Sequence, residues 1–67
     1  MYPCDCCGSL TLSVPADRAV GFICPVCDWE NDVFAKDSNE PSDENHGISL
    51  NTARMNYKRY GSIYGSQ

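Results

Sequence analysis

Hydrophobic and small polar residues alternate over residues 10–14, which read Leu-Thr-Leu-Ser-Val. A period of two is typical of a half-buried β-strand. A second apolar stretch over 20–24 predicts another strand, and Pro15 and Asp17 favour a loop between the two. We therefore expect an antiparallel β-hairpin. A third strand at 29–34 would make a three-stranded sheet, although its polar residues weaken the pattern.

The period changes in the last third of the chain. From residue 50 to residue 60, apolar and aromatic side chains recur at intervals of three or four, as on one face of a helix: Leu50, Ala53, Tyr57 and Tyr60. Ser49 is a suitable N-cap, and Gly61 stands where a left-handed C-cap residue is favoured. The pattern predicts a C-terminal helix over 49–60, followed by a frayed tail over 61–67.

Between these parts, residues 35–47 have no apolar period and are rich in Ser, Asn, Asp and Glu. We expect an acidic connecting loop that is exposed to solvent. The alternative is that this loop pairs with a basic protein or mimics nucleic acid. The whole chain has nine acidic and five basic residues and a net charge of -4. This balance argues against a general phosphate-binding surface.

Size and cysteine content together indicate a fold that is stabilised by cross-links, either disulfides or a bound metal. A single domain of 67 residues is smaller than the roughly 70–80 residues at which a hydrophobic core suffices. Five cysteines are an odd number, and no signal-peptide pattern follows Met1, so metal ligation is favoured over disulfides. We expect a cytoplasmic location. No apolar run reaches the roughly 20 residues of a membrane span.

The cysteine spacing predicts the ligands. Cys4 and Cys7 form one C-x-x-C pair, and Cys24 and Cys27 form a second one after 16 intervening residues. Two such pairs indicate a four-thiolate zinc site, with iron as the rival metal. A closed set of four protein ligands is structural, not catalytic. Cys6 remains as an alternative ligand in the first pair.

Several neighbouring side chains have an ordinary interpretation and a functional one. Cys6 is either a small packed thiol or a reactive one. His46 is either a polar loop residue or a group that contacts the start of the helix or a ligand cysteine. We expect Trp29 to cover that site and to pack on the helix against Leu50 or Tyr57. For Arg54 we expect an ion pair with Glu30 or Asp32.

Three stretches resemble the cysteine-rich CPCC family of small bacterial proteins: residues 4–8, 23–32 and 49–57. They occur in the family's order and extend over nearly the whole chain. One departure is Asp5, which stands at the proline position of the family's name but leaves the sulfur spacing intact. The resemblance implies a small zinc-ribbon-like α+β module and does not by itself assign an activity.

The leading functional hypothesis is a structural-zinc module that binds a protein partner and has no catalysis of its own. In one form of this hypothesis, the protein is an inhibitor or an immunity-type protein, and its partner is a basic enzyme or toxin whose activity it blocks. Nucleic-acid binding by a zinc ribbon is the alternative, and a thiol or zinc redox switch at Cys6 is the third. The sequence shows no phosphate loop and no nucleophile paired with a base, so we do not expect an enzyme.

Overall fold

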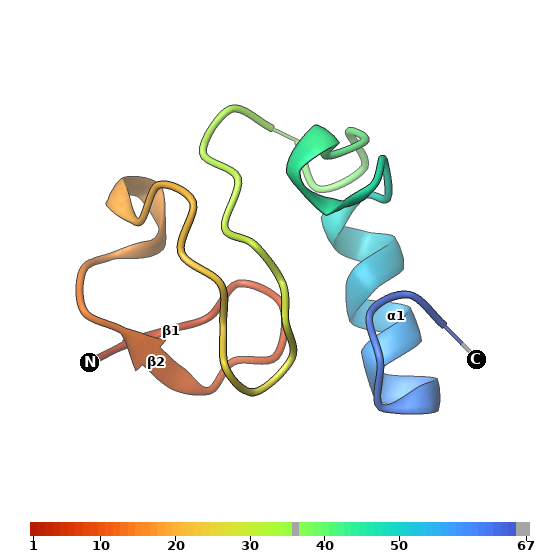
Figure 1. Ribbon diagram of the computed structural model, residues 1–67, viewed down its shortest axis with the longest axis horizontal. Coiled ribbons are helices and arrows are strands. Elements are labelled where there is room, and N and C mark those ends of the chain that lie inside the picture. Colours follow the sequence, from red (N-terminus) through yellow and green to blue (C-terminus); the bar gives the residue numbers. More distant parts are fainter. Residues whose placement is uncertain (36, 66–67) are drawn as a thin grey trace.

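The computed structural model describes residues 1–35 and 37–65 (Figure 1). In chain order its elements are β1 (Tyr2–Pro3), β2 (Leu10–Leu12), the 3-10 turns η1 (Ala16–Arg18) and η2 (Asp43–Asn45), and the helix α1 (Leu50–Tyr60). The two strands form one antiparallel sheet. Among the described residues, no helix has the length and apolar character needed to cross a membrane. The fold is a small α+β arrangement.

The sheet differs from the predicted one. β2 covers only the first part of 10–14, and its partner is β1, with Tyr2 opposite Leu12 and Pro3 opposite Leu10. Residues 20–24 contribute a single bridge, Ile23 to Glu30, and 29–34 form no strand. The predictions of a hairpin between 10–14 and 20–24, and of a third strand, are therefore wrong for the part of the chain described.

The reason for this difference lies in the two C-x-x-C segments, 4–7 and 24–27, each of which forms a turn, here called a cysteine turn. Each turn reverses the chain, so the segments directly before and after it lie side by side and pair with each other. In the first, the Cys4 N–H donates to the Ser9 carbonyl at 2.9 Å; in the second, the Cys24 N–H donates to the Trp29 carbonyl at 3.0 Å. Pairing is therefore local to each turn. The connection between the turns contains η1 instead of a tight hairpin.

The helix prediction is confirmed. α1 begins after Ser49, whose hydroxyl accepts a hydrogen bond from the Thr52 N–H at 3.1 Å, as an N-cap does. It ends at Gly61, which has a φ of 76° and donates its N–H to the Tyr57 carbonyl. Figure 1 shows α1 on one side of the molecule and residues 1–35 on the other.

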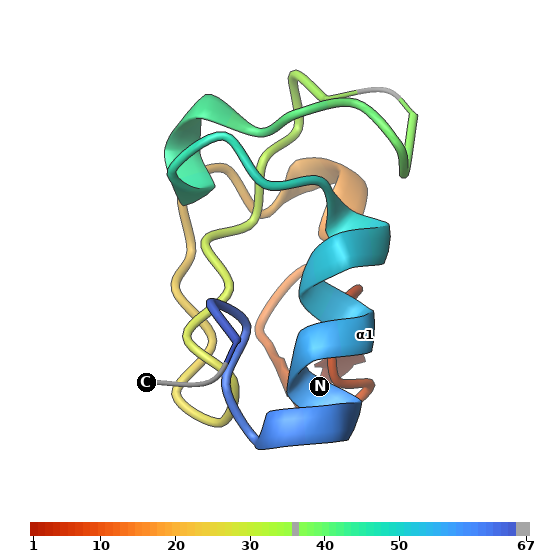
Figure 2. The ribbon, with the colours of Figure 1, turned by 90° about the vertical axis from the view of Figure 1, so that its right-hand side faces the viewer.

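The prediction of a frayed tail is wrong for residues 61–65. The chain turns back beside α1 after Gly61 (Figure 2). Ile63 is only 1% exposed, and its carbonyl accepts a hydrogen bond from Asn56 Nδ2 at 2.9 Å. One buried isoleucine thus holds the segment against the helix. Residues 66–67 lie outside the described part.

The core joins the cysteine turns to the helix. Its buried cluster consists of Cys4, Cys24, Cys27, Trp29, Ala53 and Ile63. Ile48, Leu50 and Tyr57 pack against this cluster from the helix and the segment before it. The cysteine turns and α1 therefore share one core.

The segment 35–47 is more than a solvated acidic loop. Residue 36 lies outside the described residues. Within the rest, Ser42 and Asn45 are buried while Asp43 and Glu44 remain exposed. Asn45 Oδ1 accepts from the Glu30 N–H at 2.9 Å, and its Nδ2 donates to the Glu30 carbonyl at 2.7 Å. The asparagine side chain thus pairs with the Glu30 backbone as a neighbouring strand would.

Candidate metal centre

The two C-x-x-C turns have the same backbone geometry. In the first, the Gly8 N–H donates to the Cys4 carbonyl at 2.9 Å, and Gly8 has a φ of 80°. In the second, the Asp28 N–H donates to the Cys24 carbonyl at 2.8 Å, and Asp28 has a φ of 68°. Gly8 can adopt this left-handed conformation readily, because glycine has no Cβ. The left-handed conformation of Asp28, at the equivalent position, was not anticipated.

The turns bring four sulfur atoms together. The Sγ atoms of Cys4, Cys7, Cys24 and Cys27 all lie within 4.8 Å of one another. Two contacts cross between the turns: Cys4 to Cys27 at 3.7 Å and Cys7 to Cys24 at 3.7 Å. A tetrahedron with Zn–S bonds of about 2.3 Å has edges of about 3.8 Å. These four cysteines could therefore hold a metal ion.

Two polar groups lie within hydrogen-bond distance of the Cys24 sulfur. Thr11 Oγ1 lies 3.3 Å from this Sγ, and the Val26 N–H donates to it at 3.4 Å. Thr11 belongs to β2, so the strand adjoining the first turn contributes a polar group to the second. Sequence reasoning missed Thr11, although its place in an alternating strand was the available signal.

The acidities of the thiols follow from burial and these bonds. Burial disfavours the Cys24 thiolate, but the bonds from Thr11 and from the backbone N–H groups of Cys27 and Val26 outweigh it and lower its pKa to about 6. Burial raises the pKa of Cys27 and of Cys4. A cation bound by the four sulfurs would supply the charge that makes such buried thiolates favourable.

Cys6 stands beside this set but is not part of it. Its side chain is half-buried and packs against the core cluster. Burial, together with the charges of Cys4 and Cys7, raises the pKa of Cys6 to about 11. The environment therefore favours the neutral thiol, in line with the interpretation of Cys6 as a packed residue.

Trp29 and His46, the two side chains expected to lie next to the metal ligands, are placed very differently. Trp29 is 3% exposed and belongs to the buried cluster with three of the sulfurs, against which Leu50 and Tyr57 pack. His46 is exposed, has a φ of 58°, and its ring stacks edge-on against Tyr64 with centroids 5.1 Å apart. In the described part of the chain, the His46 side chain makes no hydrogen bond to a cysteine.

Arg54 connects the helix to the first cysteine turn. Its Nε donates to the backbone carbonyl of Asp5 at 2.8 Å. The expected ion pair with Glu30 or Asp32 is not formed among the described residues. The contact still fixes α1 to the turn that contains Cys4 and Cys7.

The comparison with protein families identifies the family to which this chain belongs. The family described as Cysteine-rich CPCC matches residues 2–66. The chain belongs to this family. A comparison with curated proteins and one with solved structures found no match. In this member of the Cysteine-rich CPCC family, Asp5 replaces the proline of the motif, and the first turn keeps the backbone geometry of the second.

Proposed function

We propose that this protein is a structural-zinc module that acts by binding a protein partner and has no catalysis of its own. Its ligands are Cys4, Cys7, Cys24 and Cys27, which hold one Zn²⁺. The observation that carries the proposal is the set of four sulfurs within 4.8 Å, with 3.7 Å contacts across the two turns. Bound zinc would cross-link the turns and neutralise the thiolates.

A site closed by four protein thiolates leaves no position for a substrate or a reactive water. This supports a structural role for the metal. Three of the sulfurs belong to buried residues, which supports the same conclusion. Zinc is preferred to iron as the metal of a small thiolate module, although both accept tetrahedral sulfur ligation.

Binding of a protein is supported by the charge of the chain. Its net charge of -4 disfavours phosphate-rich nucleic acid and favours a basic partner surface. The exposed acidic residues of the segment before α1, among them Asp37, Glu40, Asp43 and Glu44, supply that charge.

The test is metal content by elemental and native mass spectrometry on protein purified under reducing conditions, with Cys4→Ser and Cys6→Ser as a matched pair. We expect one zinc per chain. Cys6→Ser should keep it, because Cys6 lies outside the four-sulfur set, and Cys4→Ser should lose it.

Three other results would each change the assignment. Loss of metal in Cys6→Ser would make Cys6 a ligand. Iron in place of zinc would correct the metal. Reduced protein that contains no metal would remove the structural site and favour the thiol redox alternative.

A further inference from the structure

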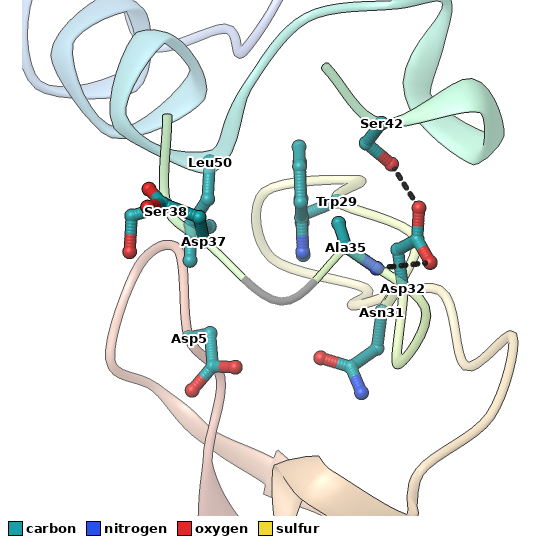
Figure 3. A pocket seen from close by; sticks show the side chains of 9 residues that line it. All are labelled: Asp5, Trp29, Asn31, Asp32, Ala35, Asp37, Ser38, Ser42 and Leu50. Atoms are coloured by element: carbon teal, nitrogen blue, oxygen red, sulfur yellow. Dashed lines mark hydrogen bonds between the residues drawn. The ribbon is translucent and has the colours of Figure 1, made fainter. Parts of the chain in front are cut away.

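A pocket of about 160 Å³ lies between the first cysteine turn, the segment 29–35 and the start of α1 (Figure 3). Three carboxylates line it, from Asp5, Asp32 and Asp37, and Trp29 and Leu50 form its apolar part. The volume is below the roughly 300–1,000 Å³ of pockets for drug-sized ligands. It suits a single side chain.

A buried amide is directed into this pocket. Asn31 is only 5% exposed, and its Nδ2 donates to the carbonyls of Ala16 at 2.6 Å and Ala19 at 2.8 Å. These two bonds fix which side of the amide carries oxygen. Oδ1 therefore points into the pocket, toward the side of Asp5 (Figure 3), and accepts no hydrogen bond from the described residues. Because no buried side-chain oxygen or nitrogen of the described residues lacks a hydrogen-bond partner, this oxygen is open to the pocket and can accept a donor from a ligand there.

Trp29 supplies a hydrogen-bond donor to the same pocket. Its indole nitrogen points into the same space (Figure 3), and its N–H has no acceptor among the described residues. No buried side-chain nitrogen of the described residues lacks a partner, so this N–H is open to the pocket and can donate to an acceptor there. A ligand that offers both a cationic donor and a nearby carbonyl, as a basic residue within a peptide does, would satisfy Asn31 and Trp29 together.

A bare metal ion fits these groups poorly. Within the described residues, the four cysteines are the only set of three or more acidic, cysteine or histidine side chains close enough to share an ion. Asp5, Asp32 and Asp37 are therefore too far apart to coordinate one ion jointly. A lysine ammonium has three N–H donors and an arginine guanidinium has five, so either can pair with some of these acceptors without requiring a complete coordination sphere.

The carboxylates also differ in their availability. Asp32 already accepts hydrogen bonds from the Ser42 hydroxyl at 2.7 Å and from the Phe34 N–H at 2.9 Å. It therefore contributes its negative charge to the pocket but has few acceptor positions left for a ligand. The Asp37 Oδ1 accepts from the Asn39 N–H, while Asp5 is exposed. Arg54 donates to the Asp5 backbone, and the described residues form no hydrogen bond to the Asp5 carboxylate.

We propose that this pocket binds one lysine or arginine side chain of a protein partner, with Asp5 and Asp37 pairing with its charge and Asn31 Oδ1 accepting its hydrogen bond. The inference rests on the proposed function and names the chemistry of the partner. It predicts that recognition centres on a single basic residue inserted beside Trp29.

The test uses zinc-loaded full-length protein and follows the single indole N–H signal by NMR, since the chain has one tryptophan. The probes are N-acetyl-lysine-N-methylamide and N-acetyl-arginine-N-methylamide, with N-acetyl-norleucine-N-methylamide as the neutral match. We expect a basic probe to shift the indole signal saturably, with millimolar affinity that falls with salt, and the norleucine probe to leave it unchanged.

The double variant Asp5→Asn, Asp37→Asn should weaken binding of the basic probe about tenfold, because two charged acceptors are lost. Asp43→Asn is the matched control. It removes an exposed acid that does not line the pocket, and screening should limit its effect to less than about twofold. Zinc content and the dispersion of the backbone spectrum establish that each variant is folded.

Equal binding of the norleucine probe, or equal affinity in the double variant, would overturn the inference. So would a response of the indole signal to CaCl2 or to a short single-stranded oligonucleotide at lower concentration than to either basic probe. Protein that binds zinc but no basic probe contradicts only the pocket, whereas protein without zinc contradicts the proposed function itself.

Discussion

The most consequential single residues outside the cysteines are buried amides. Asn45 is 0% exposed and links Glu30, shortly after the second turn, to Ser42 before α1. Asn31 links the same segment to the turn η1. Because a small domain buries few apolar groups, such buried, hydrogen-bonded amides contribute much of the positional specificity.

Replacing Asn45 by alanine should lower the free energy of unfolding by about 2–3 kcal/mol, because the Glu30 backbone and the Ser42 hydroxyl lose their partner in the interior. The measurement is denaturant unfolding of zinc-loaded protein. Asn39→Ala is the control: its bond to Asn51 lies at the surface, and its effect should stay within about 0.5 kcal/mol. Equal losses in both variants would contradict a special role for Asn45.

Asp32 gives the residue-scale prediction on pH. The Ser42 hydroxyl, followed by the N–H groups of Phe34 and Ala35, holds the pKa of Asp32 below its ordinary value. A carboxyl whose folded pKa is depressed stabilises the fold above its unfolded pKa of about 3.9, and this contribution is lost as pH falls through the folded value. In an NMR titration of the side-chain carboxyl carbon, Asp32 should stay ionised below pH about 4 while the fold persists.

Ser42→Ala is the partner variant for this titration. Removing the hydroxyl should move the pKa of Asp32 upward, toward its ordinary value, because the bond that favours the carboxylate is lost. An unchanged midpoint in Ser42→Ala would show that the hydroxyl is not the dominant cause.

At the scale of elements, the repeated unit is the cysteine turn. Each turn ends in a left-handed residue, a glycine in the first and an aspartate in the second. A Cβ at Gly8 would meet no atom within 4 Å, so the cost of a side chain there is purely conformational. The two turns can therefore be compared directly by exchange of these residues.

Gly8→Ala should destabilise the zinc-loaded protein by about 1–2 kcal/mol, and Asp28→Gly should stabilise it by up to about 1 kcal/mol, because φ is positive at both sites. Thermal or denaturant unfolding measures both. Ser13→Ala, at an exposed site outside the turns, is the control and should change little. A stabilising Gly8→Ala would contradict the left-handed geometry of the first turn.

At the scale of the whole molecule, the four-cysteine cluster and the helix share one core. Cys4, Cys24 and Cys27 pack in the same cluster as Ala53 and Ile63, so the sulfurs form part of the interior on which α1 rests. A structural zinc contributes about 10–16 kcal/mol in finger peptides, whereas whole domains are stable by about 5–15 kcal/mol. The fold of this small chain should depend on the metal.

Chelation of zinc under reducing conditions should therefore unfold the whole chain, including α1. Circular dichroism at the helix band and the dispersion of the NMR spectrum should be lost together and return when zinc is added back. Chelated, metal-free protein that keeps both signals would show that the apolar cluster alone sustains the fold.

Much of the local structure could be predicted because its signals are local. The helical period, Ser49 and Gly61 gave the bounds of α1 to within a residue, since caps act through neighbouring backbone groups. The C-x-x-C spacing likewise indicated the four sulfurs that the structure brings together. Strand pairing could not be predicted as well, because the alternation at 10–14 indicates an extended segment but does not identify its partner.

By itself, the sequence determined the helix and the two cysteine turns, because each depends on residues a few positions apart. It also determined the family, through a match that extends over residues 2–66. Only the tertiary structure decided which segments pair, that Ile63 is buried, that Arg54 bonds to the Asp5 carbonyl, and that Asn31 and Trp29 turn polar atoms into one pocket. These features depend on contacts between distant parts of the chain. Burial and the choice of hydrogen-bond partner are set by the assembled core, which no local pattern encodes.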